Sequence, residues 1–139
     1  MAATETTALT EGVHRAMPLA GMLGLEMVTS SAEQVSARLA WSPSLCTTGD
    51  IMHGGAIMAL ADSTGGLCAF NNLPEGASGT STIESKTNFL RAVRADYVEA
   101  VSKPLHVGRT VIVIETDVRR PDGSLVARVT QSQAVLRPS

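Results

Sequence analysis

The chain has few aromatic residues and no excess of positive charge. Among its 139 residues, one is Trp, one is Tyr and two are Phe, and the formal net charge at pH 7 is −2. A nucleic-acid-binding surface usually combines a basic face with aromatic side chains on which bases stack. No run of lysine or arginine is present to form such a face. We therefore expect no nucleic-acid partner.

The residue spacings of metal and redox sites are also missing. The two cysteines, Cys46 and Cys68, follow no metal-binding pattern, and the three histidines (His14, His53 and His106) are scattered along the chain. Zinc ligands occur at short, characteristic spacings, so we expect no metal site. Two lone thiols are typical of a reducing compartment, which favours the cytoplasm.

Signals for secretion or membrane insertion are absent as well. The first ten residues, MAATETTALT, have neither the basic start nor the apolar stretch of a secretory signal. The most apolar stretch, residues 51–73, contains a histidine, an aspartate and two asparagines, which a bilayer would carry poorly. The length is typical of one domain. We expect a disordered polar tail over residues 1–12 and a single domain over residues 13–139.

Hydrophobic periodicity predicts one long helix set among strands. We expect a short helix over residues 14–22, a long helix over 54–72, and six strands over 25–29, 34–41, 80–90, 96–107, 109–119 and 125–136. The last four strands should form a meander. Because the long helix is apolar on nearly every side, it should be buried. An α+β fold, with one antiparallel sheet curled around a central helix, satisfies this pattern.

A pair of glycines, Gly54 and Gly55, opens the long helix directly after His53. A helix start presents unpaired backbone N–H groups and the positive end of the helix dipole. Glycine also lets a ligand approach the backbone closely. Such a start can polarise a carbonyl group and stabilise an oxyanion. The alternative is that the glycines only form a tight turn into the helix.

Asp62 lies in the middle of this apolar helix, where aspartate is a poor helix former. A buried charge without a partner is costly, and no lysine or arginine lies three or four residues away. Three of its four helical neighbours are very small; the four are Met58, Ala59, Gly65 and Gly66. An acid beside open space is typical of a reaction site. The alternative is that Asp62 bonds a backbone group of a neighbouring strand.

The spacing of these two features limits how they could act together. Gly54 precedes Asp62 by eight residues, which is roughly 12 Å along a helix axis at about 1.5 Å per residue. A group that attacks a carbonyl carbon must come within about 3–3.5 Å of it. One helix therefore cannot supply both the oxyanion donor and the base to one carbonyl. If both features are catalytic, two antiparallel helices from two chains should share the site.

Four motifs, taken in order, resemble the hotdog-fold acyl-CoA thioesterase superfamily, in particular its PaaI-like (phenylacetic acid degradation-related) branch. They are Leu23-Gly24-Leu25-Glu26-Met27, His53-Gly54-Gly55 with Asp62 further along, Lys86-Thr87-Asn88-Phe89-Leu90-Arg91-Ala92, and Asp122-Gly123. The resemblance runs from about Leu19 to Pro138. It implies a hotdog fold, hydrolysis of acyl-CoA thioesters, and a homotetramer of two dimers with active sites between chains. Coenzyme A is then part of the substrate, and no separate cofactor is expected.

The resemblance also implies roles for single residues. Asp62 would act as general base or nucleophile, and the turn at Gly54 and Gly55 would polarise the thioester carbonyl, with Gly54 as the closer match to the usual donor. His53 would shape this turn. Some relatives place Asn or Gln near Thr47 to hold the substrate or water, and a threonine hydroxyl cannot replace an amide there.

Further substrate contacts are expected on the strand after the long helix and beyond it. A hydroxyl usually lies on that strand, and Ser81 or Thr82 matches, with Thr82 favoured. The phosphates of coenzyme A call for basic residues near the mouth of the site. Arg91 and Arg94 follow the NFLRA segment and are the first candidates; Lys103 and Arg109 are others.

Two other functions remain open. Hotdog enoyl-CoA hydratases pair the aspartate with a histidine a few residues later, and no histidine follows Asp62 before His106. A non-catalytic acyl-CoA-binding protein would not need Asp62 in an apolar helix. For a thioesterase, the adaptable side chains of Met52 and Met58 favour an aryl-acetyl or a short- to medium-chain acyl group.

Overall fold

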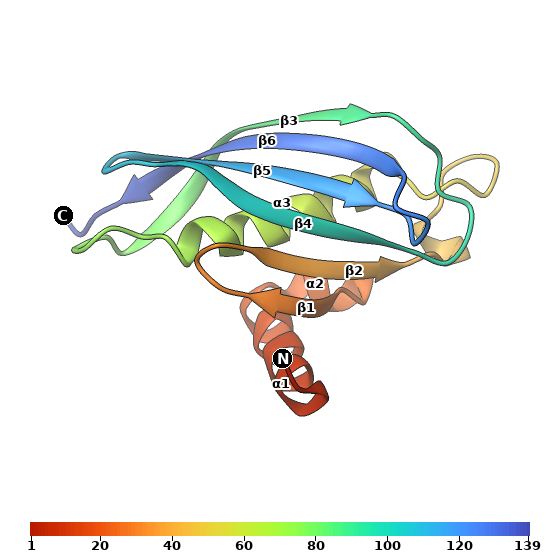
Figure 1. Ribbon diagram of the computed structural model, residues 1–139, viewed down its shortest axis with the longest axis horizontal. Helices are drawn as coiled ribbons and strands as arrows, with labels where there is room; N and C mark the ends of the chain where they lie inside the picture. Colours follow the sequence, from red (N-terminus) through yellow and green to blue (C-terminus); the bar gives the residue numbers. More distant parts are fainter.

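A six-stranded antiparallel sheet curls around one long helix, α3 (Gly54–Phe70), in the computed structural model, which describes residues 1–139 (Figure 1). The strands follow the order β1-β2-β4-β5-β6-β3 across the sheet. Their bounds are Glu26–Ser30 for β1, Val35–Ala40 for β2, Gly79–Phe89 for β3, Tyr97–Val107 for β4, Val111–Arg119 for β5 and Leu125–Leu136 for β6. The predicted α+β architecture is confirmed.

Strand β3 lies at an edge of the sheet and pairs with β6, not with β4. The predicted meander of the last four strands is therefore wrong, and only β4, β5 and β6 form one. Residues 90–96 connect β3 to β4 by crossing the end of the sheet, where the N–H groups of Leu90 and Arg91 donate to the Val126 carbonyl. Because this segment bridges the sheet end, β3 and β4 do not form a hairpin.

The N-terminal segment is a helix, α1 (Ala3–Ala16), which corrects the prediction of a disordered tail over residues 1–12. The Thr10 hydroxyl accepts a hydrogen bond from the Met27 N–H at 2.9 Å, which ties α1 to the start of the sheet. Figure 1 shows α1 projecting from the body of the molecule beside β1. The bond between Thr10 and Met27 joins residues far apart in the sequence, so local composition does not reveal that α1 is ordered.

The predicted helix over residues 14–22 is divided between two helices. Helix α1 ends at Ala16, and Pro18 begins α2 (Pro18–Leu23), in the first-turn position where its missing N–H costs nothing. Gly24 ends α2 with a φ of 78°, a left-handed conformation that glycine adopts without strain. None of the helices combines the length and the apolarity that crossing a bilayer requires.

The core lies between the concave face of the sheet and one face of α3. Leu60 and Ala61 of the helix are fully buried, as are Ile112 and Ile114 of β5. Alternate residues along β4, β5 and β6 contribute to this core because successive side chains of a strand point to opposite faces. Each fully buried aliphatic side chain stabilises the fold by about 1.5–3 kcal/mol relative to an exposed one.

The opposite face of α3 is open within the chain, which corrects the prediction that the helix is buried on all sides. Met58 and Phe70 on this face are 41% and 55% exposed. Asp62 lies between them, because residues four apart share one face of a helix. Strand β3 is exposed along most of its length, and its outer edge pairs with no other strand. The open helix face and the bare strand edge are therefore both free for contact with another molecule.

Candidate active site

Asp62 is exposed and lies within reach of two side-chain donors. The Thr82 hydroxyl of β3 and the Gln131 carboxamide nitrogen of β6 both donate to Asp62 Oδ1. Each donor lies 3.5 Å from this oxygen, which is the long limit of a hydrogen bond. The expected burial of this carboxylate is therefore wrong, and its partners are side chains, not a strand backbone. An exposed carboxylate held by neutral donors can accept a proton from water.

A cavity of about 470 Å³ opens beside the Asp62 carboxylate. This volume is within the range of about 300–1,000 Å³ typical of small-molecule sites. The cavity can hold an apolar group next to the carboxylate, because part of its wall is apolar and part is polar. The apolar part includes Met17, Leu67 and Phe70, and the polar part includes Thr80, Thr82 and Gln133.

Two glutamines of β6 that the sequence analysis missed lie beneath Asp62. Gln131 is 0% exposed and Gln133 is 1% exposed. The Gln133 carboxamide nitrogen donates to the Thr82 hydroxyl oxygen at 2.8 Å, so Thr82 is itself held in place. The sequence signal was available, because the inward positions of this strand read Ala127, Val129, Gln131, Gln133 and Val135. Two glutamines interrupt an otherwise apolar face.

The start of α3 has the form that the glycine pair predicts. His53 is the N-cap, and its Nδ1 accepts the Gly55 N–H at 2.7 Å. The Gly54 N–H is the first of the helix, so no helical carbonyl precedes it as an acceptor. A Cβ on Gly54 would lie 3.1 Å from the Phe89 ring, so this glycine also serves packing. Of the two glycines, Gly54 is the one whose N–H is left for a ligand.

Gly54 and Asp62 open into different cavities of the same chain. Gly54 lines a cavity of about 340 Å³ together with Thr47 and Arg91, and Asp62 does not line it. The cavity beside Asp62 in turn does not include Gly54. This separation agrees with the helical spacing, which forbids one chain from presenting both groups to one carbonyl.

The two candidate hydroxyls on β3 differ in position. Thr82 contacts Asp62 and pairs with the inward-facing Gln133. Ser81 pairs with Ala134 and makes no hydrogen bond to Asp62. Successive residues of a strand face opposite sides of the sheet, so Thr82 and not Ser81 is placed at the carboxylate.

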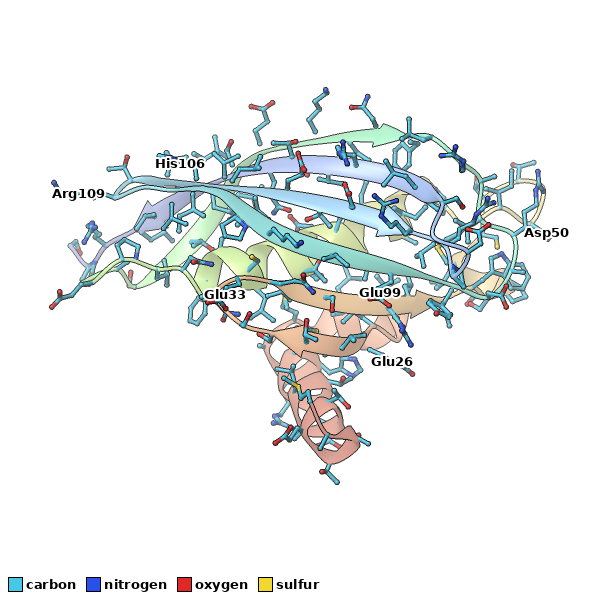
Figure 2. The ribbon with its side chains drawn as sticks, viewed as in Figure 1. Glu26, Glu33, Asp50, Glu99, His106 and Arg109 are labelled. Carbon is cyan, nitrogen blue, oxygen red and sulfur yellow. The ribbon has the colours of Figure 1, made fainter.

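The candidate arginines lie at the end of the sheet near the start of α3. Arg91 donates to the Leu125 carbonyl and Arg94 donates to the Gly49 carbonyl, each at 2.8 Å, and both side chains remain exposed. Figure 2 shows Arg109 at the far end of the sheet, opposite Asp50 in the loop before α3. Arg91 lines the cavity at Gly54, Arg94 bonds the loop before α3, and Arg109 lies at the opposite end of the sheet.

The chain is similar to known proteins in sequence. The family described as the Thioesterase superfamily matches residues 49–127. A Haemophilus influenzae protein named as an esterase is 30% identical over 112 residues, which cover 79% of this chain and 80% of that protein. The segment that the family matches, residues 49–127, contains both Gly54 and Asp62.

Solved structures share the same fold. A thioesterase (EC 3.1.2.-) from Haemophilus influenzae has a TM-score of 0.80 and 25% identity, over 86% of this chain and 82% of that one. A protein from Ralstonia eutropha JMP134, described as phenylacetic acid degradation-related, has a TM-score of 0.77 and 22% identity, over 86% and 90% of the two chains. The hotdog fold that the sequence implies is thereby confirmed.

Proposed function

The chain belongs to the thioesterase superfamily and is a thioester hydrolase, and from this premise we propose that it hydrolyses acyl-CoA with Asp62 as general base or nucleophile. The observation that carries the proposal is the Asp62 carboxylate at the wall of a partly apolar cavity, held by a hydroxyl and a carboxamide. This arrangement brings a proton acceptor next to a place for an acyl group.

Two routes lead to the same products. As general base, Asp62 takes a proton from water while the water oxygen bonds to the thioester carbon. As nucleophile, Asp62 attacks the carbon itself and forms an anhydride, which water then opens. In both routes the carbon–sulfur bond breaks, and the thiolate gains a proton to leave as free coenzyme A. The Gly54 N–H would stabilise the oxyanion, a contribution of about 10²–10³-fold in comparable sites.

A second copy of the chain would complete the site. Gly54 and Asp62 open into different cavities of one chain, so the Gly54 of one protomer would face the Asp62 of its partner. The open face of α3 and the unpaired edge of β3 support this assembly, because a long bare edge strand readily pairs with another chain. We place two such dimers in a tetramer.

The acyl-CoA would enter from the end of the molecule that carries Gly54. Arg91 and Arg94 would meet the phosphates of coenzyme A there, and Thr47 would line the path. The apolar wall beside Asp62 suits an aryl-acetyl or a short- to medium-chain acyl group. The two free thiols, Cys46 and Cys68, support a cytoplasmic location.

The test is release of free thiol from a panel of acyl-CoAs by the wild type and by Asp62→Asn, which keeps the side-chain shape and removes the charge. We expect kcat to fall about 10²-fold or more with the assembly intact. Glu33→Gln is the matched control, because it removes an exposed carboxylate from the β1–β2 turn (Figure 2).

Equal rates in the wild type and Asp62→Asn would contradict the mechanism. If neither protein releases thiol from any acyl-CoA and both bind one, the chain is an acyl-CoA-binding protein.

A further inference from the structure

We propose that Gln131 and Gln133 are positioning residues that hold Asp62 by its Oδ1 atom, so that Oδ2 is the oxygen that reacts. The inference rests on the proposed role of Asp62. Gln131 acts directly, through its carboxamide nitrogen, and Gln133 acts through the Thr82 hydroxyl.

The first support is the burial of an incompletely bonded amide. Gln131 is 0% exposed, and its Oε1 atom has no hydrogen-bond partner. Burying a polar group without a partner destabilises a fold, and an apolar side chain would suit this position of β6 better. Departures of this kind are expected at functional sites. The only side chain that the Gln131 carboxamide contacts by a hydrogen bond is Asp62.

The second support is the residue opposite Gln131 on the helix. A Cβ on Gly65 would lie 2.6 Å from Gln131 Cδ and would collide with Gln131 Oε1. Alanine is the better helix former at an interior position, so glycine is unfavourable there for the helix itself. Gly65 leaves the space in which the Gln131 carboxamide reaches Asp62.

The third support is a β-bulge in β3. The register between β3 and β6 shifts between Thr82 and Glu84. Bulges are frequent beside active sites, where they redirect a side chain. On either side of the shift, Thr82 pairs with Gln133 and Ser85 pairs with Gln131. The bulge therefore keeps a hydroxyl opposite each glutamine.

The geometry has a chemical consequence. Both donors to Asp62 reach Oδ1, and Oδ2 has no hydrogen-bond partner within the chain. Donors to a carboxylate favour its charged form. With both donors on one oxygen, the pair of glutamines would fix the direction of the free Oδ2 atom.

The test compares the pH dependence of kcat/KM in the wild type, Gln131→Leu and Gln131→Glu. Gln131→Leu removes the donor, so we expect kcat to fall about tenfold with KM changed less than about twofold. The acidic limb of the profile should move to higher pH, and further in Gln131→Glu, because a second carboxylate disfavours ionisation of the first. A merely structural role would lower stability without this ordered displacement.

A second pair of variants leaves the core untouched. Thr82 is exposed, so Thr82→Val should fold, and it removes the hydroxyl between Gln133 and Asp62. We expect Thr82→Val to move the acidic limb of the pH profile to higher pH and Thr82→Ser to restore the wild-type profile.

A double-mutant comparison tests the contact between Gly65 and Gln131. Gly65→Ala should lower kcat in the wild type and add little in Gln131→Ala, because the two changes act on one contact.

The outcomes separate this inference from the proposed function. If Asp62→Asn is as active as the wild type, the proposed function fails. If Asp62→Asn is inactive while the Gln131 and Thr82 variants keep the wild-type profile, only the positioning role fails. A fall in kcat without displacement of the acidic limb in Gln131→Leu or Thr82→Val would also overturn it.

Discussion

Two groups of polar side chains lie on the inner face of the same sheet, and they differ in whether their hydrogen bonds are complete. Ser102 of β4 and Thr116 of β5 are fully buried and bond each other at 2.7 Å. Gln131 is equally buried, but its Oε1 atom has no partner and its nitrogen reaches only the exposed Asp62 at 3.5 Å. A closed pair serves the fold, and an incompletely bonded group next to Asp62 is expected at a functional site.

Replacement of Asp62, the exposed carboxylate that Gln131 contacts, should give the largest effect on activity. We expect Asp62→Ala to lower kcat about 10²-fold or more, because the proton acceptor is lost. Its thermal midpoint should change little, because the better helix propensity of alanine offsets the loss of the long bond from Gln131. Thiol-release kinetics and thermal denaturation of the same preparation check both halves. Loss of stability together with activity would assign Asp62 to the fold.

Replacement within the closed pair should give the opposite result. Ser102→Ala leaves the buried Thr116 hydroxyl without its partner, so the free energy of unfolding should fall by about 1–3 kcal/mol. The kcat of the folded protein should not change. Adding Thr116→Val should recover part of the loss, because two apolar side chains leave no group unpaired. Denaturant titration measures these differences. A loss of kcat in Ser102→Ala would contradict the assignment of this pair to the fold alone.

An exposed pair on the outer face extends the comparison and should show the smallest effect. Arg128 binds both carboxylate oxygens of Asp117, at 2.8 and 3.0 Å, and this contact lowers the pKa of Asp117 below its ordinary value of 3.8. Arg128→Met should lower the thermal midpoint by about 2 °C or less at pH 7.

The pH dependence of this small effect follows from the direction of the pKa shift. A carboxylate with a lowered pKa stabilises the fold above its unfolded pKa, and the contribution is lost as the pH falls through the folded pKa. The difference between the wild type and Arg128→Met should therefore shrink below pH 3.8. A difference that grows as the solution becomes more acidic would contradict this explanation.

Local patterns predicted the strands and the helix because they depend on neighbouring residues. The last strand, β6, has the predicted bounds of residues 125–136, set by alternation and by the preceding Asp122-Gly123 turn. Asp62 was visible for the same reason, as a poor helix former inside an apolar run. Its exposure was not predictable, because that depends on which face of α3 the sheet covers.

The features that the sequence did not predict depend on contacts between distant residues. The pairing of β3 with β6 and the Thr10 contact that fixes α1 are of this kind. The contact between Gln131 and Asp62 is also of this kind, because these residues are 69 positions apart. A strand pattern shows that Gln131 faces inward, but only the fold shows which helical residue it meets.

The central claim is that Asp62 of one chain works with the Gly54 N–H of another. Gly54→Pro removes that N–H, and proline is well tolerated at the first position of a helix. The preceding His53 has the extended ψ of 133° that a residue before proline prefers. Gly54→Ala is the matched control, because it adds the same Cβ beside Phe89 and keeps the N–H.

The most direct measurement is the activity of mixed oligomers made by co-expressing Asp62→Asn and Gly54→Pro chains with different tags. Each variant alone should be nearly inactive. A mixed dimer would contain one site with both native groups, so random equal mixing should restore about one quarter of the wild-type rate. Mixed oligomers that form and stay as inactive as the two parents would contradict the shared site.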